Sequence, residues 1–226
     1  MSSNALFPAT IRWGAPRTVA AIVVLVLLAL LPFIAGSIGS DYYVGFGTRV
    51  LIYALAAIGL NFILGFGGMV SLGHAMYVML GAYAVAIPST HGIVSGWLHL
   101  AVAVAATAVL AAGVGAVALR TSGIAFIMIT LAFAQMLYFG AVGLKDYGGD
   151  DGLTVAERSI AGLYDLSNPT TLYYVALVTV LLALYLSWRA VLSPFGLVLR
   201  ATKANARRAT ALGHPVFRYQ LTAYVV

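Results

Sequence analysis

One glycine-rich segment carries the polar groups best placed to contact a solute inside an apolar chain. It spans residues 61–75 and reads NFILGFGGMVSLGHA. Its glycines permit a tight turn or a broken helix, and broken helices expose backbone groups that can bind a solute. The candidate residues for such a path are Asn61, Gly65, Gly67, Gly68, Ser71 and His74. The alternative is an ordinary tight turn with one hydrogen-bonded histidine, and the chemistry alone leaves both interpretations open.

A second segment, residues 193–213, is basic and contains no acidic residue. Ser193-Pro194 is a typical helix start, and Gly213 shortly before Pro215 is a typical helix stop. We predict a single helix of about 19 residues and about 28 Å, with its basic side chains on one face. Those basic residues are Arg200, Lys203 and Arg207, and the opposite face carries Phe195, Val198, Thr202, Ala206 and Ala209. Such a helix either rests on anionic lipid or is offered to a cytoplasmic partner.

A third cluster is acidic: Gly149, Asp150, Asp151 and Gly152 follow Gly148 within residues 144–169. Adjacent carboxylates point in different directions unless a turn folds them together. Because other oxygen ligands at calcium-loop spacing are lacking, we expect an exposed turn, which can still contact an external partner, and no metal site.

Several functional classes lack their signatures. The sequence has no cysteine, no P-loop lysine and no G-x-S-x-G elbow, and the glycines around Gly67 do not match the dinucleotide fingerprint. Residues 43–47 (YVGFG) are similar to a potassium filter, but too few residues precede them to form a pore helix. We therefore expect no catalytic residue, no cofactor and no channel filter.

The composition indicates the class of fold that positions these residues. Of 226 residues, 62% are hydrophobic and only 8% are charged, and the mean hydropathy is +1.01. A soluble domain has about 25% charged residues, so we predict an all-α, polytopic bundle of transmembrane helices forming a single domain over residues 1–226. Six stretches are apolar enough to span a bilayer, namely 18–35, 50–65, 69–87, 97–119, 123–143 and 170–188. A seventh begins near Phe217, and because it stops in mid-helix we expect a longer protein.

Charge distribution predicts the orientation. With the N-terminus in the cytoplasm, nine of the 12 basic residues lie inside: Arg12, Arg17, Arg120, Arg189, Arg200, Lys203, Arg207, Arg208 and Arg218. All six acids then lie outside: Asp41, Asp146, Asp150, Asp151, Glu157 and Asp165. This arrangement obeys the positive-inside rule, so the net charge of +6 indicates topology rather than nucleic-acid binding.

Three segments together resemble one family. They are residues 60–75, residues 123–136 (GIAFIMITLAFAQM) and the run that begins SPFG at Ser193 and ends ALG at Gly213. In order and spacing they are similar to the permease subunits of branched-chain amino acid ABC transporters, the M-type subunit in particular. Residues 148–153 fit the outer loop of that family, and the resemblance covers the chain from about Val50 onward.

The resemblance implies a transporter complex of several subunits. A second, related permease, two cytoplasmic ATPase subunits and a periplasmic binding protein would assemble with this chain in a bacterial inner membrane. The chain itself would be a transport subunit and not an enzyme, since ATP hydrolysis would occur on the ATPases. Related systems carry urea or short amides, so those ligands remain an alternative to amino acids, and a channel or stand-alone secondary transporter is the alternative of another class.

The resemblance also gives the basic segment a role as the helix that couples the permease to an ATPase. The residues implied in that contact are Phe195, Gly196, Arg200, Lys203, Arg207, Ala211, Leu212 and Gly213. The sequence departs from the family at Ala204, Ala206 and Thr210, where polar or acidic residues are expected. Residues 144–169 would form a periplasmic acidic loop that faces the binding protein.

Overall fold

The computed structural model describes residues 16–38, 41–153, 160–161, 164–165 and 168–226. Most of them are helical, in the order α1 (Pro16–Ile38), α2 (Asp41–Asn61), α3 (Ala75–Thr90), α4 (Gly96–Ala118), α5 (Ile124–Gly143), α6 (Pro169–Leu192), α7 (Pro194–Ala204), α8 (Ala206–Ala211) and α9 (Val216–Val225). A π-helical turn (Phe62–Phe66) extends α2, and a 3₁₀ turn (Lys145–Tyr147) follows α5. Two short antiparallel strands, β1 (Ile160–Ala161) and β2 (Tyr164–Asp165), pair in the acidic loop. The prediction of an all-α helix bundle is confirmed apart from this two-residue ladder.

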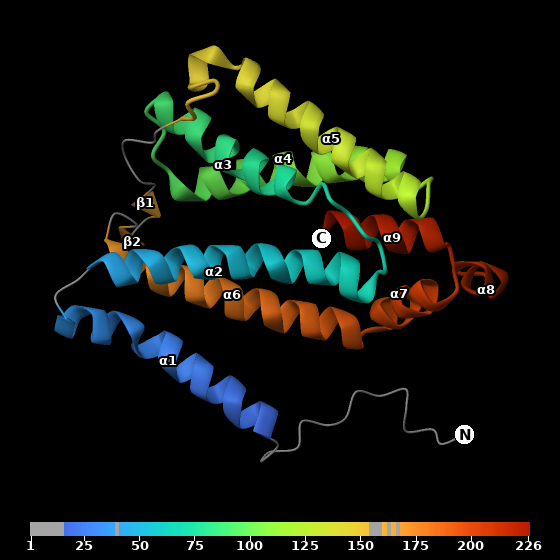
Figure 1. Ribbon diagram of the computed structural model, residues 1–226, viewed down its shortest axis with the longest axis horizontal. Coiled ribbons are helices and arrows are strands. Elements are labelled where there is room, and N and C mark those ends of the chain that lie inside the picture. The colour runs from blue at the N-terminus through green and yellow to red at the C-terminus, as the bar shows by residue number, and fades with distance from the viewer. Residues whose placement is uncertain (1–15, 39–40, 154–159, 162–163, 166–167) are drawn as a thin grey trace.

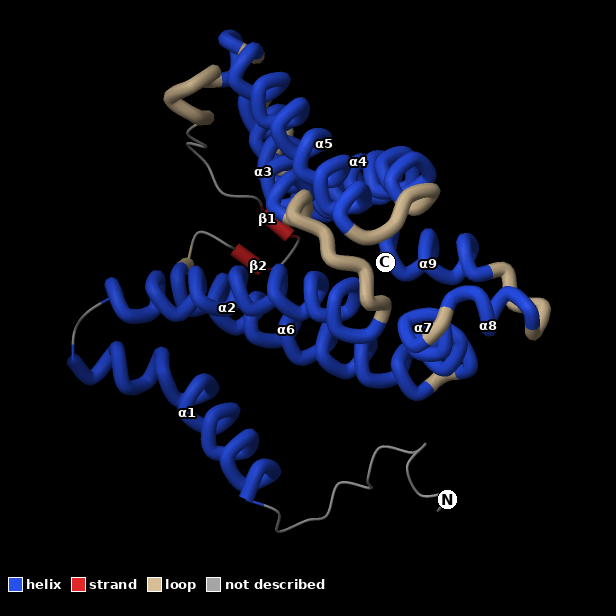
Figure 2. Tube along the Cα trace, turned by 45° about the vertical axis from the view of Figure 1, so that its right-hand side comes forward, coloured by secondary structure: helices blue, strands red, loops and turns tan. Residues whose placement is uncertain are grey.

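The long helices form two groups, and α9 lies between them. Figure 1 shows α1, α2 and α6 in one group and α3, α4 and α5 in the other, and Figure 2 shows the same separation from another angle. Within and between the groups, α2 packs along α6, α3 along α4 and α9 against α4. Successive long helices alternate in direction, so the α4–α5 turn and the pair α7–α8 share one end, while the acidic loop lies at the other (Figure 1).

Among the described residues, five stretches are long and apolar enough to cross a membrane: Val19–Gly36, Tyr42–Phe66, Gly96–Ala118, Ile124–Gly143 and Pro169–Leu192. Many of their large side chains are more than half exposed, among them Leu27, Val104, Val109 and Leu182. A surface this apolar requires lipid around it rather than water. The exposed faces therefore agree with a multi-pass membrane protein.

The third predicted span is wrong at its start. We expected it to cover 69–87, but α3 begins at Ala75 and has 16 residues. Residues 69–72 are apolar except for Ser71, so the hydropathy pattern favoured an early start. The backbone there is not helical because the chain turns at Gly68, whose φ is +69°.

The second helix begins earlier than predicted, at Asp41 rather than near Val50. It includes residues 43–47, and the Thr48 hydroxyl donates to the Val44 carbonyl at 2.9 Å, as expected inside a helix. A potassium filter needs extended backbone carbonyls that face a pore. The helical conformation therefore rules out a filter at this position.

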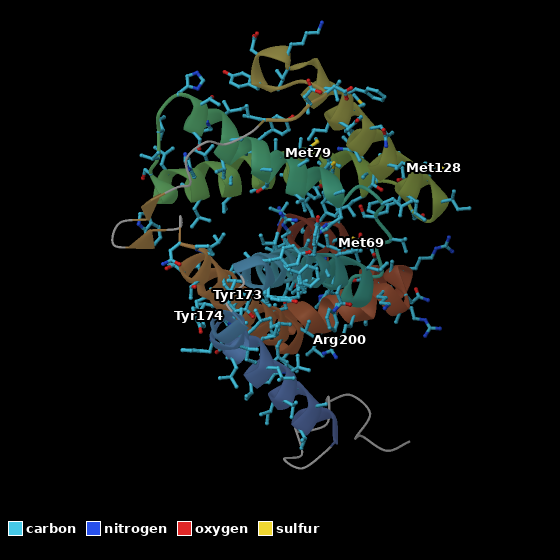
Figure 3. The ribbon with its side chains drawn as sticks, turned by 60° about the vertical axis from the view of Figure 1, so that its left-hand side comes forward. Met69, Met79, Met128, Tyr173, Tyr174 and Arg200 are labelled. Atoms are coloured by element: carbon cyan, nitrogen blue, oxygen red, sulfur yellow. The ribbon has the colours of Figure 1, made fainter. Side chains whose placement is uncertain are left out.

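Tyrosines on α6 hold α1 against the other two helices of the first group. The Tyr173 hydroxyl donates to the Leu28 carbonyl at 2.6 Å, and the Tyr174 hydroxyl donates to the Ala29 carbonyl at 3.3 Å. Figure 3 labels both tyrosines where α6 approaches α1. Tyr173 is fully buried, and Gly47 of α2 lies so close that a Cβ there would be 2.9 Å from the Tyr173 ring. The absence of a side chain at Gly47 therefore allows the three helices to meet.

The basic segment forms two helices instead of the single predicted helix. Asn205 separates α7 from α8 with φ −163° and ψ 101°, and its side-chain oxygen accepts from the Arg208 N–H at 3.0 Å. Asparagine is a strong helix N-cap, so it starts a second helix where we expected continuation. The prediction that Arg200, Lys203 and Arg207 share one continuous helix face is therefore wrong.

Candidate functional site

Helix α2 ends in an irregular stretch, residues 62–74, which we call the broken segment. It begins with the π-helical turn, in which the Gly67 N–H donates to the Phe62 carbonyl at 3.2 Å. The Met69 N–H then donates to the Ile63 carbonyl at 3.2 Å, after which the chain is irregular, with a bend at Leu72, until α3 begins. Turns of π-helix inside helical proteins occur often at functional sites. The structure thus favours the broken-helix interpretation over a simple tight turn.

Two glycines of the broken segment, Gly67 and Gly73, are required by close packing against main-chain atoms. A Cβ at Gly67 would lie 2.6 Å from the Ile63 carbonyl oxygen, and a Cβ at Gly73 would lie 2.5 Å from the Thr130 carbonyl oxygen on α5. At Gly65 a Cβ would meet the Asn61 side-chain oxygen at 2.5 Å, a contact that the side chain could relieve by moving. Real Cβ atoms do not approach backbone this closely, so the segment is a tightly fitted element and not a loose loop.

The two polar side chains of the broken segment have different surroundings. Ser71 is buried, and its hydroxyl oxygen accepts from the Gly73 N–H at 3.3 Å. The His74 ring lies half-buried with Nε2 3.2 Å from the Ala56 carbonyl of α2, so Nε2 donates this bond. The other ring nitrogen, Nδ1, is buried without a hydrogen-bond partner among the described residues. His74 thus retains one unused polar atom, whereas Ser71 serves the local backbone.

Two tyrosines, Tyr77 of α3 and Tyr224 of α9, form a row of ring contacts with His74. The His74 and Tyr77 rings meet edge to face at 5.9 Å, and the Tyr77 and Tyr224 rings meet at 6.0 Å. The two tyrosine hydroxyls lie near each other, but neither makes a hydrogen bond of regular geometry in the described part of the chain. All three side chains line a cavity of about 520 Å³ bounded by α2, the π turn, α3, α4, α6 and α9. The final residues of the sequence, Val225 and Val226, form part of its wall.

The start of α7 is built as predicted. Ser193 caps the helix, accepting from the Gly196 N–H at 3.4 Å, and Pro194 occupies the first turn. Gly196 lies against the Val191 carbonyl at the end of α6, so no larger residue fits there. Phe195 stacks on Tyr219 of α9 at 5.6 Å between ring centroids. Phe195 and Gly196 therefore hold α7 against α9 and against the end of α6.

The three predicted basic residues differ in their contacts. The Arg200 guanidinium donates to the Val191 carbonyl and to the Gly196 carbonyl, both at 3.3 Å, and Figure 3 shows Arg200 beside the α6–α7 junction. Lys203 instead reaches the broken segment, where its ammonium donates to the Gly65 carbonyl at 2.6 Å. Arg207 on α8 is exposed. The structure thus brings together two candidate sites that the sequence analysis treated separately.

An exposed groove follows the outer side of α7 and α8 and has a volume of about 560 Å³. It is lined by Leu197, Val198, Ala201, Ala204, Asn205, Arg208, Ala209, Leu212 and His214. Leu212 is 78% exposed and Leu197 is 49% exposed. The groove is therefore lined mainly by apolar side chains, and Arg208 supplies positive charge to it.

Gly213 ends α8 as predicted. Its φ is +86°, its N–H donates to the Thr210 carbonyl at 2.9 Å, and the His214 N–H donates to the Ala209 carbonyl at 3.2 Å. This pair of bonds is the Schellman arrangement, in which glycine is strongly preferred. Ala211 and Leu212 are exposed directly before it.

The acidic turn lies at the opposite end of the bundle. Gly148, Gly149 and Gly152 all have positive φ, and Asp150 and Asp151 are exposed. The exposed turn is therefore confirmed for its described part. Glu157, which we expected in the same loop, and Arg12, which we expected inside, lie outside the described residues.

Sequence reasoning missed the partners of the broken segment. Thr130 gave no signal, since it is one hydroxyl in an apolar helix, and Tyr224 lies 150 residues from His74 along the chain. Tyr77 could have been found, because it follows His74 by three residues and so shares its helix face.

The sequence of the chain is similar to those of known proteins. The family described as "Branched-chain amino acid transport system / permease component" matches residues 42–226. The high-affinity branched-chain amino acid transport system permease protein LivM of Escherichia coli (strain K12) is 26% identical over 229 aligned residues, which cover 91% of this chain and 53% of LivM. LivM of Salmonella typhimurium is also 26% identical, over 81% of this chain and 49% of that protein.

The chain thus spans about half the length of the curated relatives it matches. No solved structure matches it significantly. The family match includes the broken segment, the acidic turn and the basic helices α7 and α8. Because that match covers most of the sequence, the chain belongs to the branched-chain amino acid transport permease family.

Proposed function

We infer that the chain is a membrane-spanning permease subunit of an ATP-driven importer for branched-chain amino acids. It pairs with a second, related permease, and two cytoplasmic ATPase subunits drive the pair. A periplasmic binding protein delivers the ligand at the end that carries the acidic turn. ATP is hydrolysed on the partner subunits, so this chain is not itself an enzyme.

The observation that carries this proposal is the construction of α7 and α8. They lie at the end of the bundle where basic residues gather, and the positive-inside rule assigns that end to the cytoplasm. A helix that served only as a lipid anchor would need a basic face but no particular surface shape. Here a groove with Leu197 and Leu212 exposed is combined with three capped helix ends, at Ser193, Asn205 and Gly213. A defined shape combined with exposed apolar side chains favours a protein partner over lipid.

The acidic turn supports the same orientation from the other side. Asp150 and Asp151 are exposed there, and Asp146 lies in the neighbouring 3₁₀ turn. With the N-terminus in the cytoplasm these carboxylates face the periplasm, where Gly149 and Gly152 shape a turn that a binding protein can contact.

We place the translocation path at the broken segment. Its irregular backbone lies where α2 would otherwise continue, and non-helical backbone at membrane depth is tolerated only when it is buried in protein or lines a cavity. His74, with its unused Nδ1, lines the central cavity beside it. Gly67→Leu should stop uptake in a complex that still assembles, because the side chain has no room there. Normal uptake by an assembled Gly67→Leu complex would reduce the segment to an ordinary turn.

The deciding experiment uses the full-length protein purified with its partner subunits and reconstituted in vesicles. We expect uptake of labelled leucine, isoleucine or valine that requires both ATP and the binding protein. Uptake of urea in place of these amino acids would identify the urea or short-amide alternative. Ligand flux by this chain alone in vesicles without ATP would contradict the ABC assignment and favour a stand-alone transporter.

A further inference from the structure

Lys203 joins the basic helix α7 to the broken segment through two contacts. Its ammonium donates to the Gly65 carbonyl at 2.6 Å. Its stem lies directly against Gly68, where a Cβ would come within 2.7 Å of the Lys203 Cγ atom. These residues are separated by more than 130 positions in the sequence, so the fold alone brings them together.

The Lys203 ammonium lies at the C-terminal end of α2, where a cation stabilises a helix. Carbonyl groups in the last turn of a helix lack their regular partners, and the helix dipole gives this end partial negative charge. Gly65 belongs to the π turn with which α2 ends. Lys203 therefore supplies the missing donor and fixes the position of the first half of the broken segment relative to α7.

Gly68 makes this approach possible. Its φ of +69° turns the chain away from the axis of α2, and the missing side chain leaves room for the lysine stem. Apolar packing supports the same contact, since the fully buried Leu199 of α7 belongs to one cluster with Phe62, Ile63 and Met69 of the broken segment. A shift of α7 therefore acts on the broken segment through both packing and charge.

The other basic residues of α7 and α8 do not make this link. Arg200 binds carbonyls of Val191 and Gly196, at the α6–α7 junction. Arg207 is exposed on α8. Lys203 is also largely exposed, so water can replace the Gly65 carbonyl when α7 moves. An interaction that forms and breaks in each cycle needs this accessibility.

We propose that Lys203 is a positioning residue that transmits movement of α7 to the broken segment, holding the end of α2 in one conformation and releasing it in another. This proposal rests on the proposed function, in which α7 and α8 dock on an ATPase. It adds the element through which ATPase-driven movement would reach the translocation path.

The test uses the complete reconstituted transporter and measures substrate molecules imported per ATP hydrolysed. Lys203→Met keeps the apolar stem against Gly68 and removes the ammonium, so we expect this ratio to fall at least fivefold in an assembled complex. Lys203→Arg keeps a cation of similar reach and should recover much of the ratio. Arg120→Met removes the same charge from an exposed position in the turn between α4 and α5, outside the helices proposed to dock, and should stay within twofold of the wild type.

A second readout follows the broken segment itself. Since the chain has no cysteine, Ser71→Cys provides a single buried thiol in the segment, and its labelling by a maleimide reports opening. The thiol should react several times faster when Lys203→Met is added, and Arg120→Met should leave the rate unchanged.

Combining Gly68→Ala with Lys203→Met tests the contact from both sides. Gly68→Ala displaces the lysine stem, so it should lower the import ratio strongly in the wild-type background and much less in the Lys203→Met background. Additive effects, or an unchanged import ratio in Lys203→Met, would overturn the role of Lys203. In that case ATP-driven uptake by the wild type would still support the proposed function. Wild-type uptake that needs no ATP would overturn the proposed function itself.

Discussion

Gly73 of the broken segment packs directly on the backbone of Thr130 in α5. A Cβ at residue 73 would lie 2.5 Å from the Thr130 carbonyl oxygen and 3.1 Å from its carbonyl carbon. Thr130 is fully buried, and its hydroxyl donates to the Ile127 carbonyl at 3.0 Å. This contact fixes the end of the broken segment against the second helix group.

The first prediction concerns this contact. Gly73→Ala should destabilise the protein by about 1–3 kcal/mol, because the methyl group meets main-chain atoms that cannot rotate away. The matched control is Gly81→Ala in α3, where a Cβ meets nothing within 4 Å. That change should be neutral or stabilise by up to about 1 kcal/mol, since alanine favours a helix over glycine. Thermal unfolding in detergent measures both, and equal effects of the two changes would contradict the packing argument.

The parts of the fold that were predicted correctly depend on local chemistry. Ser193-Pro194 and Gly213 were recognised because a cap or a positive φ involves only neighbouring residues. The long spans were found because their hydropathy extends over a whole helix. The glycines and polar groups of the broken segment were likewise recognised from the sequence, because they interrupt an apolar stretch.

The parts that were missed depend on contacts distant in sequence or on competing local signals. The contact between Lys203 and Gly65 joins residues 138 positions apart, and no pattern in either segment indicates it. Residues 69–72 were assigned to a helix on hydropathy, which does not register the turn at Gly68. Asn205 was read as part of a helix, although its preference for the N-cap position could have indicated the break.

The second prediction concerns the attachment of α1. Tyr173→Phe removes the hydroxyl that donates to the Leu28 carbonyl at 2.6 Å and keeps the ring. We expect a loss of about 0.5–1.5 kcal/mol in the free energy of unfolding, the usual net value of such a bond. Tyr174→Phe, which removes the longer and exposed bond to Ala29, should cost less. A larger effect at Tyr174 than at Tyr173 would be inconsistent with the proposed attachment.

The third prediction concerns orientation. Single cysteines at Asp151 and at Arg207 can be compared in this cysteine-free chain, because both positions are exposed at opposite ends of the bundle. With the N-terminus in the cytoplasm, a membrane-impermeant maleimide should label Asp151→Cys in intact cells. It should label Arg207→Cys only after the membrane is opened. The reverse pattern would show that the topology is inverted.

The last prediction separates a coupling element from a lipid anchor. Gly213 ends α8 with φ +86°, and a β-branched residue cannot adopt this conformation without a cost of roughly 1–2 kcal/mol. Gly213→Val should therefore displace the exposed Leu212 and the end of the groove, whereas Gly213→Asn should keep the turn, because asparagine tolerates positive φ. If α7 and α8 dock on an ATPase, the valine variant loses import per ATP hydrolysed in an assembled complex, and the asparagine variant retains most of it. A lipid anchor responds to charge and little to shape, at roughly 1 kcal/mol per basic residue near the membrane surface. Normal import by Gly213→Val, together with mislocalisation when Arg207 and Arg208 are replaced by Gln, would therefore assign α7 and α8 to the lipid surface.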